Sequence, residues 1–136
     1  MLTKIDLQTP AGESLNDITA QVKAFVENSG VQEGLCVIYN PHSTAGVTIN
    51  SGLDPNTAQD IIGEVRRLVP TRVDFHHIYD TPADAAGHIK SVLVGSSLTL
   101  IVSQGKLLLG SSQSILFYDF DGPRRRQVWV RTLSEG

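Results

Sequence analysis

The sequence is poor in cysteine, aromatic residues and long hydrophobic runs, and each shortage narrows the class of protein. Its single cysteine, Cys36, cannot form an intrachain disulfide and lies in an apolar run, so we expect a buried thiol in a reducing compartment. No apolar run approaches the length that spans a bilayer, and residues 1–6 lack the apolar core of a signal peptide. These shortages predict a soluble cytoplasmic protein that does not cross a membrane.

The sequence also lacks the short motifs that mark several large enzyme classes. There is no P-loop, no dinucleotide-binding fingerprint, no nucleophile elbow and no zinc-ribbon spacing. Kinase, dehydrogenase and serine-hydrolase functions therefore have no support in the sequence.

Neither sign of charge is in large excess, because 14 acidic and 11 basic residues leave a net charge of −3. This balance argues against a nucleic-acid-binding protein. The basic residues are nevertheless unevenly spread, and Arg124, Arg125, Arg126 and Arg131 all lie within the last 13 residues. Since a guanidinium group matches phosphate oxygens, this local concentration predicts a small phosphorylated ligand.

The 136 residues, of which 40% are hydrophobic, predict one globular domain over 1–136. Apolar spacing predicts helices near 15–29, 55–69 and 82–94. It predicts strands at 1–7, 35–39, 44–50, 98–103, 106–109, 115–120 and 127–133. This order is not the regular alternation of a parallel sheet. It predicts an α+β fold in which about three helices pack on a mostly antiparallel sheet.

Two of these elements carry specific expectations about burial. The continuous apolar run at 35–39 is typical of a strand buried on both faces. In the helix at 82–94, we expect Ala86, Ile89 and Leu93 to form the buried side. Gly87 costs the helix roughly 1 kcal/mol relative to alanine, which indicates a close approach by a ligand or by another element.

The segment from His77 to His88 is the clearest candidate site. Thr81 fits the N-cap of a helix, Pro82 its first position and Asp84 the carboxylate of a capping box. Asp84 and His88 then lie one turn apart on the same face, so Asp84 could orient the His88 ring. A purely structural role for Asp84 as a helix cap explains the pattern equally well.

The strand at 44–50 alternates apolar and polar residues, so its polar face could line a pocket or simply face water. Together with other motifs, it carries a resemblance to a known family. The motifs are His-Ser-Thr-Ala-Gly-Val-Thr-Ile-Asn at 42–50, Asp54-Pro55, His77 with its spacing to 88–90, Leu-Leu-Gly at 108–110 with Gln113, and Asp-Gly-Pro-Arg at 121–124. In this order, and over nearly the whole chain, the sequence resembles the YjbQ family, often described as secondary thiamine-phosphate synthases.

The resemblance implies a compact α+β fold that forms a homotrimer, with sheets packed around a threefold axis and the site near subunit contacts. It also implies a weak ability to join a pyrimidine diphosphate to a thiazole phosphate, which gives thiamine phosphate and pyrophosphate. The matching positions imply catalytic roles for His42, His77, Asp84 (often Asn in the family) and His88, and substrate-binding roles for Thr44, Asn50, Gln113 and Arg124.

Three positions depart from the family pattern. Ser51 stands where the family usually has glutamate, and Ser112 stands where it often has tryptophan. Asp119 corresponds to a glutamate that precedes the Asp-Gly-Pro-Arg loop. The histidines are retained, whereas an acid and a large aromatic ring are lost.

Three functional hypotheses follow. In the first, the chain is a synthase of this type, and Arg124 with Mg²⁺ holds the pyrophosphate while His77 and His88 donate hydrogen bonds or protons. Arg125 or Arg126 could assist Arg124 in this role.

In the second hypothesis, His42, His77 and His88 bind Zn²⁺ and leave a fourth position for water, as in a metal-dependent hydrolase. His76 is an alternative donor. In the third, the chain is a trimeric protein that binds a phosphorylated metabolite without turnover, which the losses at Ser51 and Ser112 favour.

Overall fold

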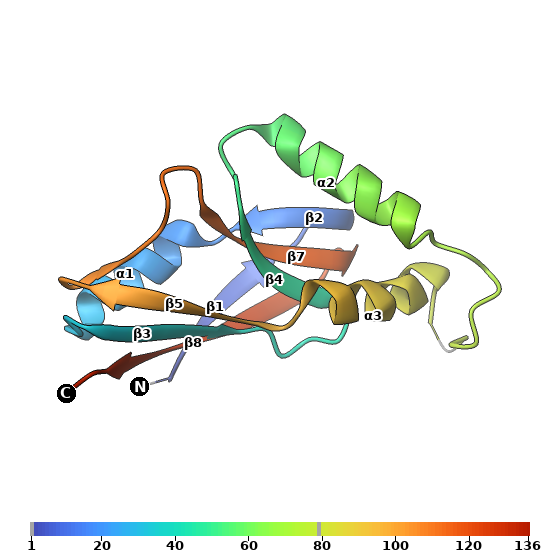
Figure 1. The fold of residues 1–136 in the computed structure, drawn as a ribbon. Coiled ribbons are helices and arrows are strands. Elements are labelled where there is room, and N and C mark those ends of the chain that lie inside the picture. Colours follow the sequence, from blue (N-terminus) through green and yellow to red (C-terminus); the bar gives the residue numbers. More distant parts are fainter. Residues whose placement is uncertain (1, 79) are drawn as a thin grey trace.

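The computed structural model describes residues 2–78 and 80–136, so Met1, the start of the first predicted strand, lies outside the described residues (Figure 1). The strands are β1 (Leu2–Gln8), β2 (Gly12–Asp17), β3 (Gly34–Tyr39), β4 (Ala45–Asn50), β5 (Ser97–Ser103), β6 (Lys106–Leu107), β7 (Ser114–Gly122) and β8 (Arg125–Ser134). The helices are α1 (Thr19–Ser29), α2 (Pro55–Leu68) and α3 (Pro82–Val94).

The strands form two antiparallel sheets. One has five strands in the order β1-β8-β3-β5-β6, and the other has three in the order β2-β7-β4. Helix α1 lies at one end of the molecule, whereas α2 and α3 lie beside the three-stranded sheet (Figure 1). The predicted α+β fold, with mostly antiparallel sheets and three helices, is confirmed.

The hydrophobic core takes side chains from both sheets and from α1. Val22 and Val26 of α1 are fully buried against residues such as Ile38 and Phe117 of the two sheets. Cys36 is buried in the same core, as predicted, and burial raises the pKa of its thiol to about 11. The polar cleft described below lies beside this core, where β4 and β8 begin and β7 ends.

The prediction for the start of α1 was wrong. Leu15 belongs to β2, where it pairs with Tyr118 of β7, and α1 begins only at Thr19. A strand forms here because β7 has a free edge opposite β4, and pairing satisfies the backbone groups of 12–17. Just before the helix, Asp17 accepts a hydrogen bond from the Thr19 N–H at 2.9 Å.

The strand predicted to be buried on both faces is buried on only one. In β3, Cys36 and Ile38 are buried, but Leu35 and Tyr39 are 40% and 43% exposed. The outward side chains line up across the five-stranded sheet, because Leu35 pairs with both Ile101 and Leu133, which are also exposed. This apolar row has no cover among the described residues of the single chain.

The predicted buried side of α3 was also partly wrong. Ala86 is buried, but Ile89 and Leu93 are 41% and 70% exposed. The helix instead presents its small residues to the three-stranded sheet, because a Cβ atom at Gly87 would lie only 3.3–3.4 Å from Thr44 and Phe120 side-chain atoms. Gly87 therefore permits a close helix–sheet contact.

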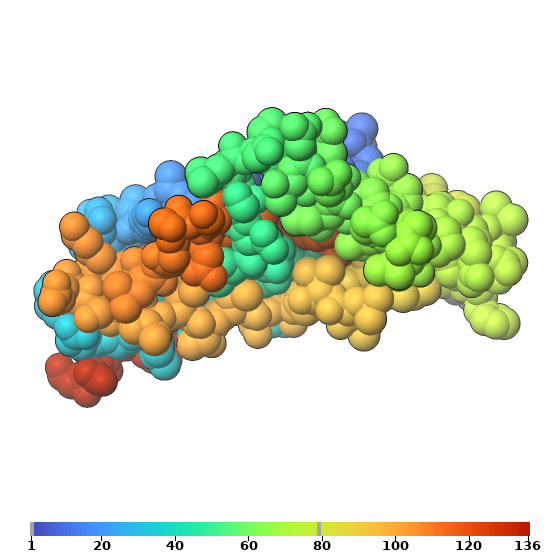
Figure 2. Space-filling model, turned by 45° about the horizontal axis from the view of Figure 1, so that its top comes forward, coloured from blue at the N-terminus to red at the C-terminus, as the bar shows by residue number. Residues whose placement is uncertain are grey.

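Helix α2 begins as predicted, with Asp54 accepting the Asn56 N–H at 2.9 Å and proline at the first position. It stands as a ridge on the surface, and none of its residues is fully buried (Figure 2). An ion pair of 2.8 Å between Arg66 and Glu13 ties it to β2. None of the helices within the described residues is long and apolar enough to cross a bilayer.

Candidate functional site

A polar cleft of about 420 Å³ lies between the loop before β4, the start of α3 and the turn from β7 to β8. Its lining residues are Pro41, His42, Ser43, Thr44, His77, Asp80, Asp84, His88, Arg124 and Arg126. The structure thus brings together most of the residues that the sequence singled out, from segments far apart in the chain.

The start of α3 is built as the sequence predicts. Thr81 is the N-cap, its hydroxyl oxygen accepts a hydrogen bond from the Asp84 N–H at 3.2 Å, and Pro82 holds the first position. Asp84 and His88 consequently project from the same face of the helix, one turn apart. The local sequence therefore fixes two members of the site.

The Asp84 carboxylate lies between two imidazoles. Its Oδ2 is 2.9 Å from His77 Nε2 and 3.2 Å from His88 Nε2, and the rings meet edge to face with centroids 5.1 Å apart. Burial of Asp84 disfavours its ionised form, but the hydrogen bond from His77 and the charges of both histidines outweigh burial and lower its pKa. Asp84 is therefore an ionised acceptor whose side chain is only 8% exposed.

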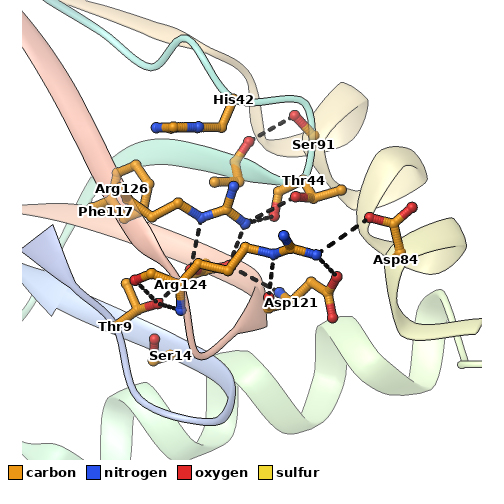
Figure 3. A network of polar contacts seen from close by, with 12 residues as sticks. Thr9, Ser14, His42, Thr44, Asp84, Ser91, Phe117, Asp121, Arg124 and Arg126 are labelled. Atoms are coloured by element: carbon orange, nitrogen blue, oxygen red, sulfur yellow. Dashed lines mark hydrogen bonds and ion pairs between the residues drawn. The ribbon is translucent and has the colours of Figure 1, made fainter. Parts of the chain in front are cut away.

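Arg124 extends from the β7–β8 turn toward the same carboxylate (Figure 3). Its Nη2 lies 3.9 Å from Asp84 Oδ1. Asp121 holds the guanidinium in place, because Arg124 donates to the Asp121 carboxylate at 2.9 Å and to its backbone carbonyl at 3.0 Å. Asp121 thus aims a partly exposed cation at the site.

Arg126 forms a buried wall of the cleft. Its guanidinium donates two hydrogen bonds to Asp119, at 2.9 and 2.8 Å, and a third to the Thr44 hydroxyl at 2.9 Å. Thr9 also donates to Asp119, at 2.6 Å. Burial of Asp119 disfavours its ionised form, but these hydrogen bonds and the Arg126 charge lower its pKa overall. Thr44, expected to bind substrate, thus supports the Arg126 side chain.

Sequence reasoning missed the Asp119–Arg126 pair, although a signal for it existed. Asp119 continues the alternation of Ile115 and Phe117, so a strand prediction places it on the core-facing side of β7. A carboxylate on that side needs a cationic partner, and the nearby arginine run offers one. The three arginines of the run lie in different environments: Arg124 faces the cleft, Arg125 is exposed and Arg126 is buried.

His42 lies over Arg126 at the edge of the cleft (Figure 3). Its Nε2 accepts a hydrogen bond from the Gln127 N–H at 2.9 Å, so the neutral ring carries its hydrogen on Nδ1. Burial and the positive charge of Arg126 lower the pKa of His42, which keeps the ring neutral near pH 7.

The histidines do not gather as the predicted zinc trio of His42, His77 and His88. Among the described residues, the group whose donor atoms approach one another closely enough for a metal ion is His77, Asp84 and His88, all within 4.8 Å. Asp84, not His42, is the third member of this group. The Nε2 of His42 instead accepts a hydrogen bond from the Gln127 backbone N–H.

Two predicted substrate-binding residues, Asn50 and Gln113, lie away from the histidine cleft. Thr44 precedes β4 and Asn50 ends it, so six residue steps along the strand place them roughly 20 Å apart. Gln113 lies near the same end as Asn50, beside a different cavity of about 560 Å³, and its side chain accepts the Gly110 N–H at 2.8 Å. Within one chain, neither residue reaches the histidine cleft.

Comparison with known proteins matches residues 3–135 to the model of a family described as UPF0047 protein YjbQ-like. A UPF0047 protein of Methanocaldococcus jannaschii is 43% identical over 99% of this chain and 96% of its own length. The YugU protein of Bacillus subtilis is 35% identical over 98% of this chain and 99% of its own length.

Solved structures show the same fold. An uncharacterized protein from Clostridium acetobutylicum, 40% identical, superposes with a TM-score of 0.91 over 96% of this chain and 99% of its own. A hypothetical protein from Aeropyrum pernix, 32% identical, superposes with a TM-score of 0.93 over 99% of both chains. A similar protein from Sulfolobus solfataricus is described as having unknown function.

Proposed function

We propose that this chain, which belongs to the YjbQ-like UPF0047 family, is an enzyme that uses a divalent cation to act on a phosphorylated small molecule. The family itself has no established function. The observation that carries the proposal is the Asp84 carboxylate, which lies between His77 and His88 and beside Arg124. Titratable groups that converge in a cleft in this way are typical of catalytic sites.

The donor set and its spacing support a zinc-like cation. In a four-coordinate zinc site the bonds are about 2.0–2.2 Å, so neighbouring donor atoms lie roughly 3.3 Å apart. The distances from Asp84 Oδ2 to His77 Nε2 and His88 Nε2, 2.9 and 3.2 Å, are close to this value. Two imidazole donors favour Zn²⁺ over Mg²⁺, because Mg²⁺ prefers oxygen ligands.

A cation bound at Asp84 and the Arg124 guanidinium would together support an anionic ligand. The cation would keep one positive charge that Asp84 does not neutralise, and Arg124 lies 3.9 Å from the other carboxylate oxygen. A phosphate group could contact both the guanidinium and the cation, since Arg124 offers a planar fork that matches phosphate oxygens. The site would then hold the phosphate end of a metabolite.

The specific reaction we propose is the coupling implied by the family resemblance. The thiazole nitrogen attacks the pyrimidinylmethyl carbon, the C–N bond forms, the C–O bond to the diphosphate breaks, and pyrophosphate leaves. The leaving group gains negative charge, which Arg124 would stabilise, and a bound cation would add Lewis-acid assistance. Neutral His42 offers an Nδ1–H that can donate to the same oxygens.

We further propose that the chain acts as a homotrimer. The uncovered apolar row of Leu35, Ile101 and Leu133 supports an interface with another copy. Asn50 and Gln113, which match the family motifs but lie far from the cleft, would then approach the cleft of a neighbouring subunit. Light scattering coupled to size exclusion tests the trimer: a monomeric mass would contradict it.

A binding protein without turnover is the second candidate, and Ser51 and Ser112 favour it. These residues replace an acid and an aromatic ring that the family pattern contains. Tight binding of a pyrimidine diphosphate with no product formed would support this candidate over the enzyme.

The test is formation of thiamine phosphate from its two phosphorylated precursors, with Zn²⁺ or Mg²⁺ present. We expect turnover by the unchanged chain, and a loss of roughly a hundredfold or more in His77→Ala. His76→Ala is the matched control, because His76 is an exposed neighbour that does not line the cleft. Equal rates in both variants would remove the site from the reaction.

A further inference from the structure

A second cavity, of about 750 Å³, adjoins the histidine cleft, and His42 and Arg126 line both. Its other lining residues are Asp6, Leu7, Gln8, Arg125 and Gln127. They come from one antiparallel ladder, because Asp6 pairs with Gln127, Leu7 with Arg126 and Gln8 with Arg125 where β1 ends and β8 begins. We call this cavity the ladder cavity.

We propose that the ladder cavity binds the organic part of the substrate, a ring that carries hydrogen-bond donors such as a ring amino group, with Asp6 as the specificity-determining residue. The inference rests on the proposed function, which assigns the phosphate part of the substrate to the neighbouring histidine cleft. One ligand would then extend past His42, with its charged end and its ring on opposite sides of that residue.

The hydrogen bonds around Asp6 indicate which ligand groups the cavity suits. Trp129 Nε1 donates to the Gln127 side-chain oxygen at 3.3 Å, and the Gln127 amide nitrogen donates to Asp6 Oδ1 at 3.1 Å. This chain of donors fixes the orientation of both the amide and the carboxylate. An ionised carboxylate only accepts hydrogen bonds, so Asp6 would select ligands with N–H or O–H donors.

The two cavities differ in the ligand parts they suit. The histidine cleft is lined almost entirely by polar and charged groups, and its 420 Å³ suits a phosphate group with a cation. The ladder cavity is larger, at 750 Å³, and Leu7 is among its lining residues. Sites for small organic ligands typically combine apolar surface with a few fixed polar groups in volumes of this order.

His42 is suited to the junction between them. Because its Nε2 is held by the Gln127 N–H, its remaining ring hydrogen is on Nδ1, and the ring adds no positive charge between the two cavities. The same Gln127 residue therefore supports His42 with its backbone and Asp6 with its side chain. Gln127 thus links His42, at the junction with the phosphate site, to Asp6, in the proposed ring site.

The experiment measures two dissociation constants by calorimetry, with Zn²⁺ present. The probes are inorganic pyrophosphate, which tests the histidine cleft, and an aminopyrimidinylmethyl diphosphate, whose ring also tests the ladder cavity. We expect the ring to tighten binding by roughly tenfold or more in the unchanged chain, as one hydrogen bond to a charged group does. In Asp6→Ala this advantage should fall to less than about threefold, with pyrophosphate binding unchanged.

Two controls keep the result specific. Asp60→Ala removes an exposed carboxylate from α2, away from both cavities, and should leave both constants unchanged. Asp6→Asn keeps a side-chain oxygen that can accept the hydrogen bond from Gln127, so it guards against a general loss of structure. It should also reduce the factor by which the ring tightens binding. Thermal melting of each variant checks the fold.

The outcomes separate the two proposals. If pyrophosphate binds but the ring adds nothing, or if Asp6→Ala weakens both probes equally, the ladder-cavity inference is overturned and the proposed function stands. If pyrophosphate does not bind the unchanged chain, the phosphate site itself is wrong and both proposals fail.

Discussion

Replacing Asp119 by alanine should destabilise the protein severely, because the change leaves a buried cation without its partner. Arg126 is 5% exposed, and two of its guanidinium hydrogen bonds end on the Asp119 carboxylate. The Thr9 hydroxyl and the Asp121 N–H also lose their acceptor. Removing one member of a buried, hydrogen-bonded ion pair typically costs about 3–5 kcal/mol.

We therefore expect Asp119→Ala to lower the free energy of unfolding by about 3–5 kcal/mol in urea titrations. In a chain of this size, the loss corresponds to a fall in Tm of about 10–20 °C. A double variant, Asp119→Leu with Arg126→Met, should recover much of the loss, because it removes both charges.

Asp121→Ala is the comparison for this experiment. Asp121 pairs with Arg124, whose side chain is 45% exposed, so its loss should cost no more than about 1 kcal/mol. A loss below about 1 kcal/mol in Asp119→Ala would refute the reasoning, since it would show that water reaches Arg126 or that the pair contributes little.

Three further predictions follow from the structure. The pKa of Asp119 is lower in the folded chain than its ordinary value of 3.8, so on acidification the unfolded chain binds a proton at a higher pH than the folded chain does. The free energy of unfolding should therefore fall as the pH drops below about 4. In Asp119→Asn, urea midpoints should fall less steeply over this pH range. Gly46→Ala should destabilise by about 1–3 kcal/mol in the same titrations, because its Cβ would lie 2.8 Å from a Val94 methyl carbon; an unchanged midpoint would show that α3 can shift. Cys36, buried and with a pKa of about 11, should react with a thiol reagent at pH 8 only after denaturation, and rapid labelling of the native chain would contradict its burial.

The local structure that the sequence predicted correctly around the candidate site depends on neighbouring residues. The cap of α3 by Thr81, the proline after it and the one-turn spacing of Asp84 and His88 are all local, so the pattern was enough. The turn between β5 and β6 is also local, because both of its residues, Gln104 and Gly105, have positive φ, as a tight hairpin requires.

The parts that failed depend on distant partners. Residues 12–17 carry no strong strand pattern, and they form β2 only because β7 offers a free edge. The buried face of α3 followed from the contact of Gly87 with Thr44 and Phe120, which outweighed the larger apolar side chains of the helix. Spacing alone does not reveal such contacts.

The positions of the candidate residues also depend on distant partners, so they could be seen only in the folded chain. The sequence offered His42 as a metal ligand, but the Gln127 N–H, from 85 residues further along, occupies its Nε2. Asn50 and Gln113 share the family motifs with His77, yet the length of β4 separates them from the cleft. Only the folded chain separates residues that line the cleft from those that lie elsewhere.

The most direct test of the proposed site is a calorimetric titration of the metal-stripped chain with Zn²⁺ near pH 7. We predict one bound ion per chain in the unchanged protein and in His76→Ala, and loss of that binding in both Asp84→Ala and His88→Ala, with melting temperatures close to that of the unchanged apoprotein. Stoichiometric binding that survives both substitutions, or no binding by the unchanged chain, would contradict a cation site at His77, Asp84 and His88.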